Sequence, residues 1–197
     1  MLTVTGMSAG IDYYRKAVAE GIEEYYQGIG EAPGQWTGHS AHETLGLAGE
    51  IDPDDLHAIF AGADPATGVQ LGVFTKRSVI GFDLTFKAPK SVSLLMGLGS
   101  TDVARQVIDA HEAAVDATLD WVETNVARTR IGKGGATQVE VDGIVAAKFR
   151  HRTSRAGDPH LHTHVLVANA VQGPNGRWRT LDARMLYTHA KSGGYLY

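Results

Sequence analysis

The sequence predicts an α+β fold, in which an antiparallel sheet of about five strands carries helices packed on one face. Segments 79–86 and 161–171 alternate or run apolar with the period of β-strands. Segment 102–127 repeats apolar residues at the spacing of an amphipathic helix. Asp158-Pro159 forms a turn signal that lets neighbouring strands pair antiparallel. The remaining face of the sheet is expected to carry histidines.

Length and composition indicate one globular domain. The chain has 197 residues, of which 43% are hydrophobic and 20% charged. The absence of cysteine excludes disulfides and thiolate metal sites. No apolar run approaches the roughly 20 residues that span a membrane, and the N-terminus M-L-T-V-T-G-M-S has no signal-peptide pattern. We therefore expect a cytoplasmic protein without a membrane span.

Charge is distributed unevenly along the chain, whose net charge is −4. Residues 1–127 hold 7 Lys+Arg and 18 Asp+Glu, whereas residues 128–197 hold 11 and 4, so the halves carry −11 and +7. A basic half would suit a polyanionic substrate. The alternative is a dipolar protein whose two halves simply pair, and charge alone does not separate these interpretations.

The N-terminal third begins with a strand at 2–5, and Ser8 is placed to cap a helix over 9–27. An apolar stripe along that helix is formed by Tyr14, Val18, Ile22 and Tyr25. Tyr13 lies roughly 100° from this stripe and is free to face another part of the molecule. Residues 28–49 are predicted to form an irregular loop anchored by Trp36.

The middle of the chain contains a helix with Asp52 as N-cap and Pro53 as first residue, which ends at Gly62. In strand 79–86 one face is apolar, and Asp83 is the only acid on the other, open face. A turn at 88–91 leads into a short apolar helix. Asp102 is expected to cap the long helix that reaches about residue 127.

The C-terminal part is predicted to contain strands 137–141 and 144–151, joined at Asp142-Gly143 by a type I′ hairpin turn. The histidine-bearing strand follows. After a turn at 174–176, Asp182 begins a last helix. Residues 1–197 are expected to form one domain that is truncated at its C-terminal end.

Four of the nine histidines lie between positions 151 and 164. Because strand side chains alternate, His162 and His164 point to the same face, and the turn at Asp158-Pro159 would bring His151 beside them. Neutral imidazoles are good metal ligands. Histidines on a polar strand face can also be merely solvated, but their concentration on two neighbouring strands favours a metal site.

A metal ion held by three histidines keeps open coordination positions and can polarise a phosphodiester oxygen. A tyrosine can serve as nucleophile if a base or hydrogen bond assists its phenol, whose unperturbed pKa is near 10. Asp83 could be that base, or could orient a ligand histidine. Both roles remain open from the residues alone.

The segment F-R-H-R-T-S-R-A-G-D-P-H-L-H-T-H-V at 149–165 resembles the metal-binding core of the MobF-class conjugative relaxases, the TrwC/TraI-like branch of the HUH endonucleases. The resemblance extends to the tyrosine doublets at 13–14 and 25–26. It also includes I-G-F-D-L-T-F-K-A-P-K-S-V-S at 80–93. It thus covers nearly the whole chain.

The resemblance implies a metal-dependent single-stranded DNA endonuclease and transesterase that nicks and rejoins a plasmid transfer origin. Tyr13 would attack the DNA phosphate, giving a 5′-phosphotyrosyl intermediate and a free 3′-hydroxyl, and Tyr25 would be the second tyrosine. A divalent ion, Mg²⁺ or Mn²⁺, would be bound by His151, His162 and His164. Three imidazoles suit Zn²⁺ or Ni²⁺ equally well. Asp83 would be the base or the residue that orients a metal histidine.

The implied partners are single-stranded DNA at a transfer origin, a downstream helicase domain and the conjugation machinery. A rolling-circle replication initiator or a transposase would use the same chemistry. A DNA-binding module that keeps this fold but has lost activity is the alternative from another class. A small-substrate metallohydrolase would leave the basic half and the tyrosine doublets unexplained.

Overall fold

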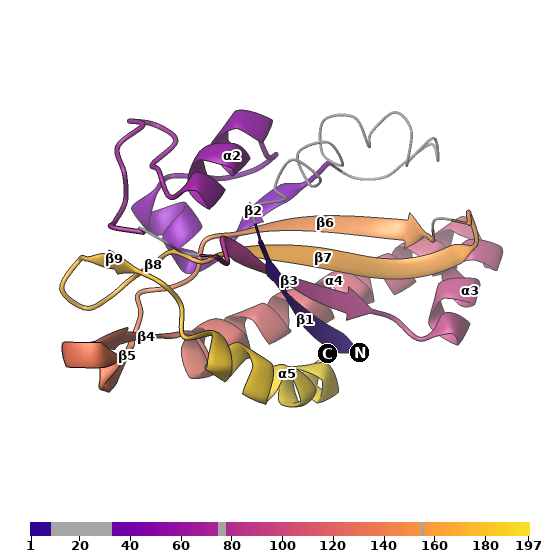
Figure 1. Ribbon diagram of the computed structural model, residues 1–197. Coiled ribbons are helices and arrows are strands. Elements are labelled where there is room, and N and C mark those ends of the chain that lie inside the picture. The colour runs from indigo at the N-terminus through magenta and orange to yellow at the C-terminus, as the bar shows by residue number, and fades with distance from the viewer. Residues whose placement is uncertain (9–32, 75–77, 155) are drawn as a thin grey trace.

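The computed structural model describes residues 1–8, 33–74, 78–154 and 156–197 (Figure 1). The predicted helix over 9–27, with Tyr13 and Tyr25, lies outside these residues. The strands are β1 (Leu2–Met7), β2 (Gln35–Thr37), β3 (Gly81–Lys87), β4 (Arg128–Ile131), β5 (Thr137–Glu140), β6 (Ala146–Thr153), β7 (Pro159–Ala168), β8 (Val171–Gln172) and β9 (Trp178–Arg179). The helices are α2 (Pro53–Ala61), α3 (Lys90–Leu98), α4 (Thr101–Asn125) and α5 (Ala183–Leu196), with a π-helix η1 (Ser40–Thr44) and a 3₁₀ turn η2 (Lys133–Gly135).

Five strands form the central antiparallel sheet, in the order β1-β3-β7-β6-β2. This confirms the predicted fold class. The strand β7 occupies the middle, paired on one side with β3 and on the other with β6. The segment that carries His162 and His164 is therefore held on both edges, which fixes the direction of its side chains.

One face of the sheet packs against the long helix α4 and against α5, on the lower side in Figure 1. The sheet contributes side chains at alternate positions, among them Phe82, Leu84 and Val165. The helices contribute Val115 and Leu119. Because the burial of one such side chain stabilises a fold by about 1.5–3 kcal/mol, this layer holds the sheet in place behind the histidines.

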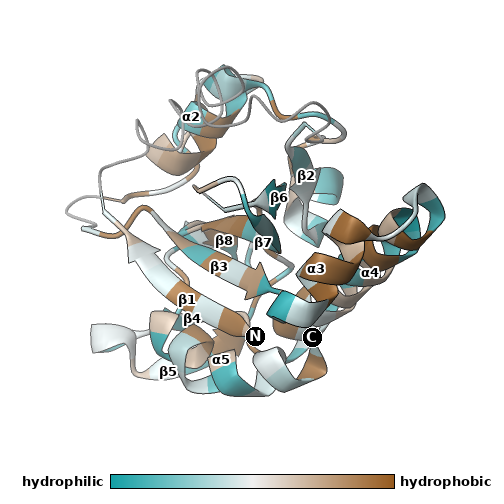
Figure 2. Cartoon of the chain, turned by 90° about the vertical axis from the view of Figure 1, so that its right-hand side faces the viewer, coloured by the Kyte–Doolittle hydropathy of each residue, from teal (hydrophilic) through white to brown (hydrophobic). Residues whose placement is uncertain are grey.

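The opposite face is divided into two halves. Helix α2 covers the half formed by Leu166 and Ala168 of β7 and their neighbours on β6, through Leu56, Ile59 and Phe60. The histidines occupy the other half. Figure 2 shows this polar half as the teal ends of β6 and β7, close to the apolar helix α3. The same strand face thus changes from packed core to polar site along its length.

Strand β3 departs from the expected open polar face. Asp83 is 5% exposed and Thr85 is 6% exposed, and every position from Gly81 to Phe86 is buried. The strand lies between β1 and β7, and Asp83 contacts His164, so Asp83 is on the same sheet face as the histidines, although it is shielded from solvent. Alternation predicted the direction of this side chain correctly and its exposure wrongly.

The predicted N-cap is correct for helix α2 and wrong for helix α4. Helix α2 begins as predicted, with the Asp52 carboxylate accepting hydrogen bonds from the N–H groups of Asp54 and Asp55. Helix α4 does not begin at Asp102, because its N-cap is Ser100, whose hydroxyl oxygen accepts a hydrogen bond from Val103 N–H. Asp102 instead lies in the first turn, where its charge favours the helix dipole.

The predicted hairpin across Asp142-Gly143 is wrong. Strand β5 pairs with β4, and β6 pairs with β2 and β7. Gly143 has φ 157°, which is not the geometry of a type I′ turn. The turn that joins β4 to β5 contains Gly134 and Gly135, with φ 67° and 69°. Glycine adopts this left-handed conformation without strain.

Two smaller features also differ from the expectation. The loop predicted at 28–49 contains the short edge strand β2, whose Trp36 is 5% exposed and anchors the segment as expected. Strand β7 begins at Pro159, so His160 lies inside it.

No helix in the described ranges has both the length and the apolar character that crossing a membrane demands.

Candidate metal centre

Three histidines meet on the polar half of the sheet because of the register between β6 and β7. His151 of β6 lies directly opposite His162 of β7, and Phe149 lies opposite His164. Residues 162 and 164 are two apart on one strand and share a face. The antiparallel pairing predicted from the sequence is confirmed, and it brings these histidines together.

The three imidazoles are arranged as a compact triangle. Their ring centroids are separated by 5.0 Å (His151–His162), 5.2 Å (His162–His164) and 5.5 Å (His151–His164). One ligand nitrogen from each ring can be chosen so that all three lie within 4.8 Å of one another. Small changes in side-chain torsion therefore suffice to place the three nitrogens around one ion.

The ring of His164 is oriented by a buried carboxylate. Its Nδ1–H donates to Asp83, with nitrogen–oxygen distances of 2.8 Å to Oδ2 and 3.0 Å to Oδ1. The hydroxyl of Thr85 donates to Asp83 Oδ1 at 3.2 Å. A histidine that donates from Nδ1 carries its lone pair on Nε2. Asp83 thereby fixes the tautomer in which His164 can bind a metal through Nε2.

A backbone carbonyl performs the same task for His162. The Nδ1–H of this ring donates to the carbonyl oxygen of His160 at 2.8 Å, so its Nε2 is also available. The ring of His160 lies 4.8 Å from that of His162, centroid to centroid. His160 is thus a fourth histidine at the edge of the site, but it does not belong to the triangle of ligand nitrogens.

Burial keeps two of the three rings neutral. Desolvation, reinforced by the charges that His162 and His164 would carry, lowers the pKa of His151 to about 3. Desolvation is also the largest cause that lowers the pKa of His162 to about 4. A metal ion binds the neutral imidazole, so no proton has to be displaced from these two rings at neutral pH.

The donor set fits a divalent ion. Imidazole nitrogen suits Zn²⁺, Ni²⁺, Cu²⁺ and Mn²⁺, and three protein ligands leave coordination positions for a substrate oxygen. The two oriented rings, His162 and His164, already present Nε2. The residues present therefore fit a metal site with open positions, and the kind of metal is not determined by the ligands.

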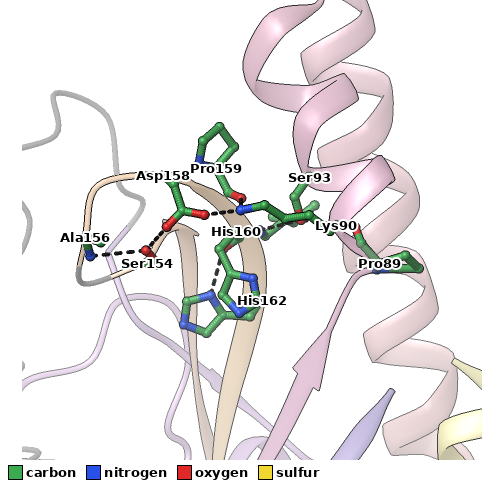
Figure 3. A network of polar contacts seen from close by, with 10 residues as sticks. Pro89, Lys90, Ser93, Ser154, Ala156, Asp158, Pro159, His160 and His162 are labelled. Atoms are coloured by element: carbon green, nitrogen blue, oxygen red, sulfur yellow. Dashed lines mark hydrogen bonds and ion pairs between the residues drawn. The ribbon is translucent and has the colours of Figure 1, made fainter.

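The turn between the two ligand strands is attached to helix α3 (Figure 3). The Lys90 ammonium forms an ion pair with Asp158 and donates to the carbonyl of Pro159 at 2.9 Å. The Ser154 hydroxyl donates to the same carboxylate. The N–H of Leu161 donates to Ser93 Oγ at 3.0 Å. These contacts connect the start of β7 to a rigid helix next to the ligands.

The back of the ligand strand is held by a second histidine network, on the α4 face. His111 is 5% exposed, and its two ring nitrogens lie 2.7 Å from Thr163 Oγ1 and 2.7 Å from the Tyr197 hydroxyl. Burial, followed by the charge of Arg150, lowers the pKa of His111 to about 4. A neutral His111 can accept one hydrogen bond and donate the other, so it can satisfy both the Tyr197 hydroxyl and the hydroxyl of Thr163, the residue between His162 and His164.

The structure places four of the six site residues expected from the sequence in one cluster: Asp83, His151, His162 and His164. The other two, Tyr13 and Tyr25, lie outside the described residues. Sequence reasoning did not identify the Thr163–His111 contact or the Lys90–Asp158 pair as parts of the site. Only the register between distant strands and helices reveals them, and no local motif signals it.

The fold and the site together define a protein with a histidine triad on one face of a five-stranded antiparallel sheet, with one ligand oriented by a buried aspartate. The chain belongs to the TrwC relaxase family, whose family model matches residues 7–197. Two relatives from Escherichia coli and its strain K12, each described as multifunctional conjugation protein TraI, are 40% and 39% identical over 165 residues. These matches cover 82% of the chain but only 9% of the length of each relative.

Solved structures give the same family. The conjugative relaxase TrwC in a copper-bound complex with oriT DNA superposes with a TM-score of 0.84 at 33% identity, covering all of this chain and 67% of that one. A metal-bound TrwC complex with oriT DNA gives a TM-score of 0.80 at 31% identity, with 100% and 66% coverage. At these identities the likeness extends beyond the overall fold to the family.

Proposed function

We propose that this chain is a metal-dependent single-stranded DNA endonuclease and transesterase that nicks and rejoins DNA at a plasmid transfer origin. The observation that carries the proposal is the triangle of His151, His162 and His164 with Asp83 behind His164, in a chain of the TrwC relaxase family. Two solved structures of the conjugative relaxase TrwC are complexes with oriT DNA, one copper-bound and one described as metal-bound.

In the proposed reaction Tyr13 is the nucleophile. Its phenolate oxygen forms a bond to a DNA phosphorus while the bond from phosphorus to the 3′-oxygen breaks. The leaving 3′-oxygen takes up a proton, so the products are a 5′-phosphotyrosyl ester and a 3′-hydroxyl. Tyr25 is proposed as the tyrosine for a second strand transfer. Rejoining is the reverse of the first step, since the phosphodiester energy is kept in the tyrosyl ester.

His151, His162 and His164 would hold the divalent ion, which would be Mg²⁺ or Mn²⁺, with Zn²⁺ or Ni²⁺ also suited to three imidazoles. When bound, the ion withdraws charge from a phosphate oxygen. Asp83 is proposed to orient His164 rather than to act as base, because its carboxylate is bound to His164 Nδ1 and is 5% exposed.

We also propose that the protein works in the cytoplasm with the conjugation machinery, and that a helicase domain acts downstream of this domain. The relatives described as multifunctional conjugation proteins support this, since the region matched here is 9% of their length. These partners follow from the family rather than from contacts in the structure.

A covalent-capture gel tests the proposal. The protein is incubated with Mn²⁺ and single-stranded oligonucleotides that tile its native flanking DNA, and is then denatured. We expect a slow band that is lost in Tyr13→Phe, retained in Tyr14→Phe as the matched control, and much weaker in His162→Ala.

Other outcomes would change the assignment. A band that survives Tyr13→Phe would move the nucleophile to Tyr14, Tyr25 or Tyr26. DNA binding without any covalent band would favour an inactive DNA-binding module of the same fold. Capture only at a replication or transposon origin would favour a rolling-circle initiator or a transposase.

A further inference from the structure

Lys87 is the last residue of β3 and lies directly opposite His162 on β7. Residues 83, 85 and 87 of one strand share a face, so Lys87 projects to the same side as Asp83 and Thr85. Directly opposite residues have Cβ atoms about 4.5–5.5 Å apart. The register therefore places a lysine side chain beside a metal-ligand candidate, although the sequence motif gave it no role.

Among the residues that the structure describes, none neutralises the charge of Lys87. Other cations of the sheet and its helices are paired: Lys90 with Asp158 (Figure 3), and, on the α4 face, Lys148 with Asp116 and Arg150 with Glu112. Within the part of the chain that the structure describes, no ion pair or hydrogen bond involves the Lys87 ammonium. Since Lys87 is half-buried, this unpaired cation is held near the site instead of being fully solvated.

The electrostatic effect of Lys87 reaches the histidine triangle. Lys87 occupies the strand position directly opposite His162, and cross-strand neighbours lie within reach of a long side chain. A cation beside metal ligands opposes the binding of a second cation, so Lys87 does not help to hold the ion. It would instead favour an anion that approaches the metal.

We propose that Lys87 binds a non-bridging phosphate oxygen of single-stranded DNA at the His162 edge of the metal centre. The inference rests on the proposed function, because it assumes that the centre receives a DNA strand. A lysine ammonium is a compact point charge and a common phosphate ligand. In a site partly removed from water its interaction with a phosphate is stronger than on an open surface.

The contact predicts a specific salt dependence. Neutralising one lysine that contacts a single-stranded phosphate reduces the slope of log Kobs against log salt by about 0.7. We therefore compare Lys87→Gln with Lys87→Arg, which keeps the charge. The matched control is Lys191→Gln, an exposed lysine of α5, the helix that covers the opposite face of the sheet.

Binding is measured by fluorescence anisotropy with Mn²⁺ and a labelled oligonucleotide, in the Tyr13→Phe background so that no strand is cut. We expect Lys87→Gln to bind roughly tenfold more weakly at low salt, with the reduced slope. Lys87→Arg should retain the slope and most of the affinity. Lys191→Gln should behave as the parent.

A neutral methylphosphonate placed at single positions in the oligonucleotide locates the contact. At one phosphate, the penalty seen with the parent should disappear in Lys87→Gln, since both changes remove the same interaction. The melting temperature of Lys87→Gln should be unchanged, and its Mn²⁺ affinity should be unchanged or higher, because a charge that repels the ion has been removed. A loss of either would indicate that Lys87 supports the fold instead, and would overturn the proposal.

The two proposals fail in different ways. The first failure is one in which the parent binds the oligonucleotide, but Lys87→Gln shows the same salt slope and the same loss of affinity at every methylphosphonate position. The Lys87 contact would then be wrong, and the proposed function would be unaffected. If the parent binds no single-stranded DNA, the proposed function fails and the Lys87 contact fails with it.

Discussion

The carboxylate of Asp83 and the Nδ1 atom of His164 are joined across two strands, at 2.8 Å and 3.0 Å from the two carboxylate oxygens. Asp83 is nearly inaccessible, whereas His164 faces the site. A buried anion therefore determines which nitrogen of the ligand ring is free. The first prediction follows from this arrangement.

Asp83→Ala should weaken Mn²⁺ binding by about 10–100-fold, because loss of a carboxylate that orients a metal histidine has effects of that size. Asp83→Asn should lose less Mn²⁺ affinity, because the amide oxygen can still accept the hydrogen bond from His164 Nδ1–H. Isothermal titration calorimetry measures both. Equal affinity in Asp83→Ala and the parent would exclude an orienting role.

A second prediction concerns the effect of metal on stability. Ligand at about 100 times its Kd stabilises a protein by about 2.7 kcal/mol, which for a chain of this size is a rise in Tm of roughly 5–10 °C. Mn²⁺ should therefore raise the Tm, and EDTA should reverse the change.

The rise should be absent in His162→Ala and retained in His57→Ala, a matched change at an exposed histidine of α2. Differential scanning fluorimetry with increasing Mn²⁺ measures all three proteins. A metal-dependent rise in His162→Ala equal to that of the parent would place the metal elsewhere.

Acid should destabilise the metal-free protein before most carboxylates titrate. In the unfolded chain these histidines take up protons near pH 6.5, whereas the folded-state pKa values are about 4 for His111 and His162 and about 3 for His151. Between these values the unfolded state binds more protons, so the free energy of unfolding falls as the pH is lowered.

The full stability contribution is present above pH 6.5, and each of the three histidines removes up to about 1.4 kcal/mol per pH unit below it. Urea unfolding in EDTA at pH 7.5, 6 and 5 measures this slope. His111→Gln should reduce the slope, and His57→Gln should leave it unchanged. A flat profile between pH 7.5 and 5 would contradict the low folded-state pKa values.

The last prediction tests the support behind the ligand strand. Thr163→Val keeps the shape of a side chain that is 3% exposed but removes the hydroxyl that contacts His111. An unsatisfied buried ring nitrogen costs about 1–3 kcal/mol, so the Tm should fall by several degrees. Thr5→Val, at an exposed position of β1, should change stability little, and equal Tm values for the two variants would argue against the network.

The parts of the structure that were predictable from sequence are those governed by local periodicity. Alternation placed His162 and His164 on one face, and the turn at Asp158-Pro159 brought His151 opposite His162, as the register shows. The cap of α2 was also predictable, because Asp52-Pro53 is a local signal.

The errors came from contacts between distant segments. Asp142-Gly143 looked like a hairpin turn, but β5 found its partner in β4, which the sequence did not reveal. The burial of Asp83 could not be predicted from the alternation of its strand, which gives the direction of a side chain and not what packs over it. The sequence position of Asp83 could not decide between a role as base and a role in orienting a histidine, because the choice depends on the distance from Asp83 to His164.

The alternation along β7 has a consequence for how this sequence can change over generations. Leu161, Thr163 and Val165 face the core while His162 and His164 face the site. Inserting or deleting a single residue within the paired part of β6 or β7 would exchange the core-facing and site-facing residues. The imidazoles would then be buried and the aliphatic groups exposed. Natural variants should therefore change the length of this hairpin in steps of two residues, or at its turn. A strand shifted by one residue would fail to fold, so selection for stability alone preserves the alignment of the metal ligands.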